Sequence, residues 1–285
     1  MRITAKDLSF TYNKKSAFKS DALKNVTIDI PEGEFFGIIG HTGSGKSTFI
    51  QHLNALIPVQ SGSLVVGDVD LSKGKKTDKK LLKTLRAKIG MVFQYPEYQL
   101  FAETVFEDVA FGYKNFKPDA DQNEIKNAVY GALNRVGVDP SLADKSPFEL
   151  SGGQKRRVAI AGVIVTSPEV LVLDEPVAGL DPVGKRELMR LLHELHSETC
   201  KTVIIVSHDM DEVCENCSHV AVFSEGQIVL TGTPRQVFSQ GDKMRELRLG
   251  VPLTAYLVEK LAEKGVTVDC DLTEKDFIRA VKELC

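Results

Sequence analysis

The sequence predicts an α/β domain built around a parallel sheet, followed by a short helical extension. Short apolar runs typical of buried strands alternate with segments whose apolar residues recur at helical spacing. The runs Phe35–Ile39, Val170–Leu173 and Thr202–Ser207 are almost entirely apolar, as strands covered on both faces are. A glycine-rich turn follows the first run and opens a helix, which is the arrangement of a phosphate-binding loop.

Composition narrows the class of protein. Of the 285 residues, 42% are hydrophobic and 26% charged, which excludes a largely disordered chain. The net charge of −3 excludes a polycation that coats nucleic acid. No apolar run approaches the roughly 20 residues that cross a bilayer, and the N-terminus lacks the apolar core of a signal peptide.

The five cysteines are odd in number and scattered, which favours a reducing compartment. Cys214 and Cys217 have the spacing of half a zinc site. No second pair accompanies them, so ordinary thiols are the favoured interpretation.

The N-terminal part is predicted to form strands. Alternating apolar residues indicate strands at Ile3–Tyr12 and Val26–Ile30, and Ser63–Val69 returns to strand after the first helix. Residues 73–88 then hold eight Lys or Arg. A solvated loop and helix is the favoured interpretation of this stretch, and a nucleic-acid or lipid-headgroup patch is the alternative.

The remaining elements follow from the same periodicities. Strands are expected at Ile89–Phe93, His219–Phe223 and Gln227–Thr231, the last two joined by a turn. The expected helices are Glu124–Val136, Gln154–Val165, one near Lys185–His196, Leu253–Glu263 and Glu274–Leu284. Thr273 is a plausible N-cap for the last helix.

The segment Gly40–Ser47 reads GHTGSGKS and matches the phosphate-loop pattern between a strand and a helix. Glycines let backbone N–H groups wrap phosphates, and the helix adds its positive N-terminus. Lys46 is expected to neutralise the β- and γ-phosphates, and Ser47 to offer a hydroxyl to Mg²⁺. The nucleotide-binding residues expected in this region are Gly40, Gly43, Ser44, Gly45, Lys46, Ser47 and Thr48. No chemistry is assigned to the side chains of His41 and Thr42.

The run Val170–Leu173 ends in two acids, Asp174 and Glu175. Ligands of parallel sheets bind at the carboxyl ends of the strands, so these acids are expected to face the nucleotide. Asp174 is placed to hold Mg²⁺ through water, and Glu175 to polarise the water that attacks the γ-phosphate.

A second glycine-rich helix start lies at Leu150–Gln154, which reads LSGGQ. Ser151 is placed to cap the helix, and Gly152 and Gly153 allow an anion to approach the backbone closely. With Gln154, these residues form a candidate phosphate contact that is separate in sequence from the first loop.

Over about residues 1–235, the sequence resembles the nucleotide-binding subunits of ABC transporters. Besides the three motifs, the match includes Gln94, Ala178–Asp181 and His208. The resemblance implies that Gln94 senses nucleotide and contacts Mg²⁺, that Asp181 links the two sites of a dimer, and that His208 touches the γ-phosphate. The implied cofactors are ATP and Mg²⁺, the latter held by Ser47, Gln94 and Asp174.

The resemblance also implies the fold and the assembly. It implies a P-loop NTPase (RecA-like) core with an antiparallel β subdomain, a helical subdomain inserted at about residues 94–162, and an extension at 236–285. Two subunits are expected to meet head to tail, each nucleotide lying between the phosphate loop of one and Ser151–Gln154 of the other. Tyr12 resembles the aromatic residue that stacks on adenine, with packing in the core as the alternative.

The stretch Tyr95–Tyr113 is rich in aromatic residues and acids. It holds six of the 20 aromatic residues and four acids, without Lys or Arg. A groove for a partner helix that carries Arg or Lys is the favoured interpretation, and packing of the helical subdomain is the alternative. The expected groove residues are Tyr95, Glu97, Tyr98, Phe101 and Glu107.

Three segments resemble the ATPases of energy-coupling factor transporters, which import vitamins or Ni²⁺/Co²⁺. They are Gln94–Gly112, Ser146–Glu149 and the pair His41-Thr42. The pattern is most similar to the second (A-prime) of the two paralogous ATPases, although Tyr113 and Val177 depart from it.

This resemblance implies a set of partners. They are a sister ATPase, in a heterodimer or otherwise a homodimer, a transmembrane coupling (T) subunit that docks near Gln94, and indirectly a membrane substrate-binding (S) subunit. Nucleic acid is not among them, and the protein is expected at the cytoplasmic face of the membrane. The extension is expected either to hold the ATPase dimer together or to pack on its own domain.

The sequence opposes three rival functions. A conventional importer ATPase is opposed by the Tyr95–Gly112 pattern. A soluble ABC protein of DNA repair or translation is opposed by the single copy of each motif and the lack of a heptad insert between Lys46 and Ser151. A module that binds ATP without turnover is opposed by the presence of Glu175 and His208.

Overall fold

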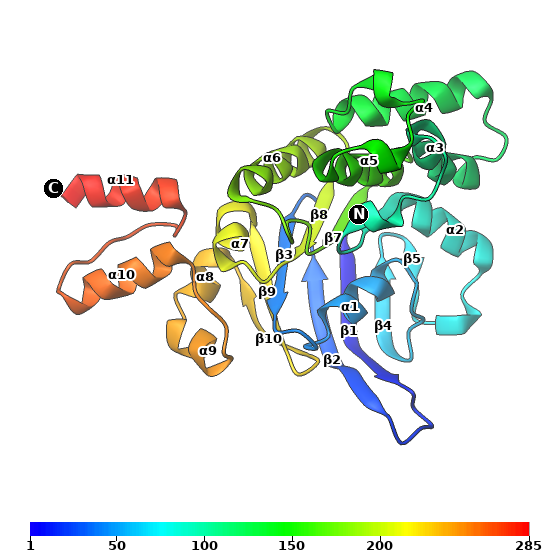
Figure 1. Ribbon diagram of the computed structural model, residues 1–285. Helices are drawn as coiled ribbons and strands as arrows, with labels where there is room; N and C mark the ends of the chain where they lie inside the picture. The colour runs from blue at the N-terminus through cyan, green and yellow to red at the C-terminus, as the bar shows by residue number, and fades with distance from the viewer. Residues whose placement is uncertain (285) are drawn as a thin grey trace.

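The computed structural model describes residues 1–284 and contains two sheets (Figure 1). The first is antiparallel, with the strand order β2-β1-β4-β5. The second has the order β10-β9-β3-β8-β7-β6, and all its pairs are parallel except that of β10 with β9. The strands are β1 Ile3–Tyr12, β2 Ser20–Ile30, β3 Phe35–Gly40, β4 Ser61–Val66, β5 Val69–Asp70, β6 Ile89–Val92, β7 Val170–Asp174, β8 Thr202–Val206, β9 His219–Ser224 and β10 Gln227–Gly232.

The helices lie on both faces of the parallel sheet (Figure 1). The main-domain α-helices are α1 Lys46–Leu53, α2 Lys79–Lys88, α3 Val105–Phe116, α4 Gln122–Arg135, α5 Gly152–Ile164, α6 Pro182–Glu198 and α7 Met210–Asn216. The short 3-10 helices are Gly74–Lys76, Pro96–Gln99, Pro140–Leu142 and Pro147–Glu149. Among residues 1–284, no helix is long and apolar enough to span a membrane. The predicted α/β architecture is confirmed.

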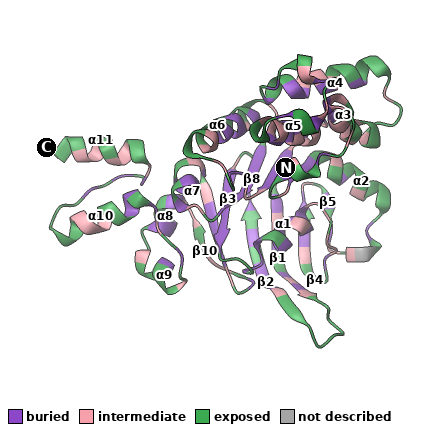
Figure 2. Cartoon of the chain, viewed as in Figure 1, coloured by how far each residue is buried: buried purple, intermediate pink, exposed green. Residues whose placement is uncertain are grey.

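The all-apolar strands are explained by two separate cores (Figure 2). Along β3, Phe36 and Ile38 point into a core shared with α1 and the antiparallel sheet. Their neighbours Phe35 and Ile39 point into the other core, which helices α3–α6 complete. Successive side chains of a strand face opposite sides, so a strand between two cores has no polar position.

The predicted helical insert is built mainly from α3, α4 and α5, which pack on one another. Thr104 caps α3 by accepting a hydrogen bond from the Glu107 amide at 3.1 Å. The basic stretch forms a short 3-10 helix and α2, whose Asp78 cap accepts from Lys80 and Leu81. Leu85 is the buried residue of α2, which fits a mostly solvated helix.

The C-terminal extension runs along one end of the molecule, orange to red in Figure 1. It holds α8 Pro234–Phe238, α9 Gly241–Glu246, α10 Leu253–Glu263 and α11 Glu274–Leu284. The last two bounds are those predicted, and Thr273 caps α11 as expected, accepting from the Asp276 amide at 3.3 Å. Phe238 and Leu249 join the larger core, whereas α11 buries none of its residues.

Candidate nucleotide-binding and catalytic site

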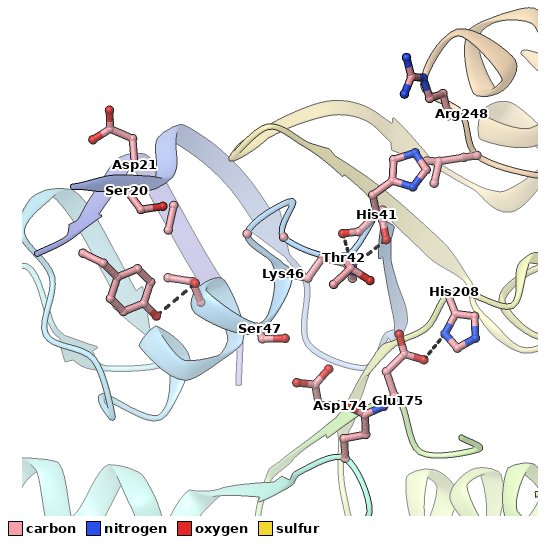
Figure 3. Close-up of a pocket in the computed structure, with 18 of the residues that line it drawn as sticks. Ser20, Asp21, His41, Thr42, Lys46, Ser47, Asp174, Glu175, His208 and Arg248 are labelled. Carbon is pink, nitrogen blue, oxygen red and sulfur yellow. Dashed lines mark hydrogen bonds and ion pairs between the residues drawn. The ribbon is translucent and has the colours of Figure 1, made fainter. Parts of the chain in front are cut away.

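A cavity of about 700 Å³ opens at the carboxyl ends of the parallel strands (Figure 3). It brings together most of the phosphate loop, the two acids that end β7, and His208, which follows β8. Tyr12 and Gln94 also line it. Apart from Ser44, which is buried and does not line the cavity, the predicted nucleotide-binding and catalytic residues meet in one place, although the chain separates them widely.

The phosphate loop adopts a conformation that requires glycine. Gly43 and Gly45 have φ angles of 81° and 105°, in the left-handed region that other residues rarely adopt. A Cβ atom on Gly45 would lie 2.5 Å from the Ala22 carbonyl oxygen, so this position has no room for a side chain. The loop leads directly into α1, whose N-terminus faces the cavity and favours an anion there.

Lys46 is held across the loop. Its buried Nζ donates hydrogen bonds to the carbonyl oxygens of Gly40 at 2.6 Å and His41 at 2.8 Å. Burial lowers the pKa of Lys46, and the nearby carboxylates of Glu175 and Asp174 offset part of that effect. A buried ammonium placed in this way stabilises anionic phosphate groups.

Asp174 lies at the end of β7, beside Ser47 (Figure 3). Burial raises the pKa of Asp174, and the Ser47 hydroxyl and Lys46 counteract the rise. Ser47, Asp174 and Gln94 offer only oxygen donors that suit Mg²⁺. In the described part of the chain, no group of three or more His, Cys, Asp or Glu could hold a metal by itself, so a bound Mg²⁺ would take further ligands from phosphate and water.

Glu175 and His208 form a direct pair. His208 Nδ1 donates to Glu175 Oε2 at 2.6 Å, and the Glu175 amide donates to the Val206 carbonyl at 2.9 Å. The φ angle of Glu175 is 52°, an uncommon conformation for a glutamate. Such backbone strain concentrates at functional sites, where the surrounding structure enforces it. The pair places a carboxylate acceptor beside the end of the phosphate loop.

Tyr12 comes from β1 and also lines the cavity. Its ring is 38% exposed and meets Phe10 edge-on at 4.8 Å, and its hydroxyl is 3.3 Å from Thr48 Oγ1. Phe10 beside it is buried, so Phe10 supplies the core packing, and Tyr12 presents its ring to the cavity.

The signature residues lie outside this cavity. Ser151 caps α5 by accepting from the Gln154 amide at 3.3 Å, and Gln154 Oε1 accepts in return from the Ser151 amide at 3.0 Å. Gly152 and Gly153 are exposed, and a Cβ atom on either would meet nothing within 4 Å. Asp181 is also exposed and caps α6, accepting from the Gly184 amide at 2.7 Å.

Glu97, expected in the partner groove, is paired within its own chain. Its carboxylate accepts two hydrogen bonds from Arg156 of the same chain, at 2.8 and 3.0 Å, and the Arg156 side chain is only 5% exposed. Burial alone would raise the pKa of Glu97, but the bonds from Arg156 lower it overall. A basic partner helix that docked here would therefore meet a carboxylate that Arg156 already neutralises.

The other expected groove residues are exposed. Tyr98 is 84% exposed, and Tyr95, Phe101 and Glu107 also face solvent. Phe101 meets Phe111 edge-on at 4.9 Å. Tyr95 and Tyr98, whose ring centroids are 6.0 Å apart, and Phe101 therefore present exposed aromatic rings shortly after Gln94 in the chain.

Arg156 is a residue that motif reasoning missed. Besides Glu97, its guanidinium donates to the carbonyls of Pro176 at 3.1 Å and Ala178 at 3.0 Å. It thus joins α5 to the Gln94 loop and to the segment after Glu175. A buried arginine within a run of basic residues gives no signal in sequence, because nothing distinguishes it from Lys155 and Arg157, which are only partly buried.

The extension also reaches the site, which was not predicted. His41 Nε2 donates to the Leu247 carbonyl at 2.5 Å, and Arg248, Leu249 and Gly250 line the cavity.

The two thiols with zinc-like spacing, those of Cys214 and Cys217, lie away from this site in the larger core, where burial raises the pKa of Cys214 to about 12. Such a thiol is not ionised at neutral pH. The fifth cysteine, Cys285, lies outside the described residues.

Comparison with known proteins decides the family. The ABC transporter family profile matches residues 23–178, more than half of the chain. An energy-coupling factor transporter ATP-binding protein (EcfA2) of Caldanaerobacter subterraneus is 46% identical over 95% of this chain and 93% of its own length. The EcfA2 protein of Enterococcus faecalis is 47% identical over 94% of this chain and 92% of its own. The chain belongs to this family of ABC ATPases.

Solved structures agree with that assignment for this energy-coupling factor ATPase. The structure of cbiO1 from Clostridium perfringens, part of the ABC transporter complex cbiONQ, has a TM-score of 0.74 and 40% identity, covering 90% of this chain and 98% of that one. A dimeric ATP-binding cassette, MJ0796, in a post-hydrolysis state with ADP and Pi has a TM-score of 0.71 and 30% identity, covering 82% and 99%. The chain is therefore an ATPase with the ABC fold, and ATP is its nucleotide.

Proposed function

We propose that this ATPase powers substrate uptake as one half of an ATPase dimer, most simply as the A-prime subunit paired with a sister ATPase. One observation carries the proposal. Lys46, Asp174, Glu175 and His208 share one cavity, whereas the start of α5 lies outside it and presents exposed glycines. A second subunit that supplies its own signature motif would complete the site.

The chemistry follows from the groups that line the cavity. Bound Mg²⁺ would be held by Ser47 and Asp174, with Gln94 at the rim, and would neutralise charge on the phosphates. Lys46 and the N-terminus of α1 bind the phosphate oxygens. Glu175 accepts a proton from the attacking water, and His208, hydrogen-bonded to it at 2.6 Å, fixes the direction of its carboxylate.

Tyr12 is proposed to stack on the adenine ring. Its exposure and its place among the residues that line the cavity support this assignment. Asp181 is proposed to communicate between the two sites. Its role as the cap of α6 supports this, because movement of the loop would be passed directly to that helix.

The aromatic surface of Tyr95, Tyr98 and Phe101, with Glu107 beside it, is proposed to receive a helix of a transmembrane coupling subunit. Exposed aromatic residues are enriched at protein interfaces. The substrate is proposed to be a vitamin or a transition-metal ion captured by a separate membrane subunit, and the ATPase would then lie peripherally on the cytoplasmic face.

The extension is proposed to contribute to the ATPase dimer. Its last helix, α11, buries none of its residues, yet it carries the apolar side chains Ile278 and Leu284 on its surface. The extension also packs on its own domain, through the buried Phe238 and Leu249 and, from α11, through the partly buried Phe277, Ala280 and Val281.

The test is affinity purification of the tagged chain from native membranes, with identification of the partners by mass spectrometry. One coupling protein and one sister ATPase are the expected result. A conventional importer's permease, or a ribosomal or nucleic-acid fraction, would contradict the proposal.

A charge reversal tests the docking surface in the same preparation. Glu107→Lys should reduce recovery of the membrane subunit by about tenfold, the scale expected for a like charge at an interface. The exposed Glu198→Lys on α6 is the matched control and should leave recovery unchanged. Full recovery with Glu107→Lys would remove Glu107 from the docking surface.

A further inference from the structure

Glu212 is a buried acid for which the mechanism above has no use. It lies on α7, four residues after His208, and is only 7% exposed. Its Oε2 atom accepts a hydrogen bond from the Ser207 hydroxyl at 3.0 Å. Its Oε1 atom is buried and makes no hydrogen bond to any described residue. A carboxyl group with an unsatisfied buried oxygen is costly for the fold, so its presence calls for a reason.

The contacts of Glu212 enclose the His208 segment. The Ser207 hydroxyl, which donates to Glu212, accepts in turn from the Asp209 amide at 3.1 Å. The Glu212 amide donates to Asp209 Oδ1 at 3.1 Å, and Lys185 of α6 donates to Asp209 Oδ2 at 2.8 Å. The residues before and after His208 are therefore both tied to Glu212.

His208 itself depends on such support. Its side chain is 72% exposed, and Glu175 is its hydrogen-bond partner among the described residues. An exposed ring receives little orientation from packing, so its position must come from the backbone that carries it. We propose that Glu212 is a positioning residue for His208, acting through Ser207 and Asp209.

The charge of Glu212 gives this role a pH dependence. Burial raises the pKa of Glu212 to about 7; the nearby carboxylates of Asp209 and Glu175 add to the rise, and Ser207 and Lys185 oppose it. Cys217 also lies near the carboxyl group and stays neutral, because burial raises its pKa well above the usual value. Glu212 is thus neutral below about pH 7 and charged above it. A carboxylate accepts more strongly than a carboxylic acid, so the Ser207 bond tightens as the pH rises.

The first test is the steady-state ATPase activity of the complex purified from membranes, with Glu212→Gln and Glu212→Ala. We expect Glu212→Ala to lower kcat about tenfold, the scale of one hydrogen bond to a charged group, while KM for ATP stays within about twofold. Glu212→Gln keeps an acceptor for Ser207 and should lose less. It should also remove the part of the rise in kcat between about pH 6 and 8 that comes from Glu212, because an amide does not titrate.

The controls separate positioning from a general loss of stability. Glu198→Gln, an exposed acid at the end of α6, should leave kcat and its pH profile unchanged. Ser207→Ala breaks the same link from its other side, so the double variant Ser207→Ala with Glu212→Gln should be no slower than the slower single variant. Strictly additive losses would overturn the proposal. So would a wild-type kcat and pH profile in Glu212→Gln.

Discussion

The nucleotide cavity and the start of α5, to which the proposed function gives the two halves of one reaction, are built in opposite ways. In the cavity, Lys46 is buried and bonded at 2.6 and 2.8 Å, and Glu175 is paired at 2.6 Å. At the start of α5, Gly152 and Gly153 are exposed with nothing nearby. The side chains of the cavity are held in place by hydrogen bonds within the chain, whereas the start of α5 is held only by its capping box. The difference supports the proposal that one subunit binds the nucleotide and that turnover needs two.

Glu175→Gln should have the largest effect, because it removes the base while keeping the shape of the cavity. We expect kcat to fall by about a hundredfold or more, the scale of a lost general base. ATP affinity should persist, and the closed dimer should be stabilised. Phosphate release and gel filtration with ATP measure both outcomes. Wild-type turnover would sink the assignment of Glu175.

Lys46→Ala tests the binding half of the comparison. It removes the buried ammonium that faces the phosphates, and affinity for ATP should fall about ten- to a hundredfold, as for loss of charge-assisted hydrogen bonds. Equilibrium binding to the isolated chain is the measurement, because this half-site is complete in one subunit. Unchanged affinity would count against the phosphate-loop assignment.

Gly153→Ala tests the other half. The added methyl group meets no atom of its own chain, and alanine favours a helix, so thermal stability should stay the same or rise by up to about 1 kcal/mol. ATP binding to the single subunit should also be unchanged. Hydrolysis by the dimer should fall about tenfold, since the methyl group obstructs the partner's phosphates. Equal loss of binding in the isolated chain would break the division between the two regions.

Tyr12→Ala should have the smallest effect. Loss of an aromatic stack costs about 0.5–1.5 kcal/mol, or about two- to tenfold in affinity for ATP. Tyr12→Phe keeps the ring and should restore that affinity. If Tyr12 served the core instead, Tyr12→Ala would lower the unfolding temperature and leave the affinity ratio of ATP to inorganic triphosphate unaltered.

Local pattern predicted most of this architecture. The bounds of β1, α10 and α11 coincide with those predicted, because alternation and helical spacing run without interruption to their ends. β2 is longer than expected and begins at Ser20, because its first half pairs with the end of β1 although its apolar pattern is weak. The strand propensity of single residues does not reveal that two segments pair in a sheet.

The site was predictable where a motif is contiguous and unpredictable where distant segments meet. Lys46, Asp174 and His208 each follow a strand that the sequence marks, so their convergence could be anticipated. The pairing of Glu97 with Arg156 spans 59 residues, and that of His41 with Leu247 spans 206. Side-chain contacts at such distances along the chain depend on tertiary packing, which a single sequence does not display.

The extension cannot be cut away to leave a minimal ATPase. Two hydrogen bonds join the extension to α7, the helix that follows His208. The Leu253 amide of the extension donates to Asp211 Oδ1 at 2.7 Å, and Cys214 Sγ of α7 donates to the Leu272 carbonyl at 3.3 Å. His41 of the phosphate loop is bonded to the same extension. Truncation after residue 235 would therefore expose the part of the larger core that Phe238 covers. It would also remove the contacts of the phosphate loop and of the helix that follows His208. Substitutions in the extension are therefore expected to change the rate of ATP hydrolysis even when every catalytic motif is unchanged.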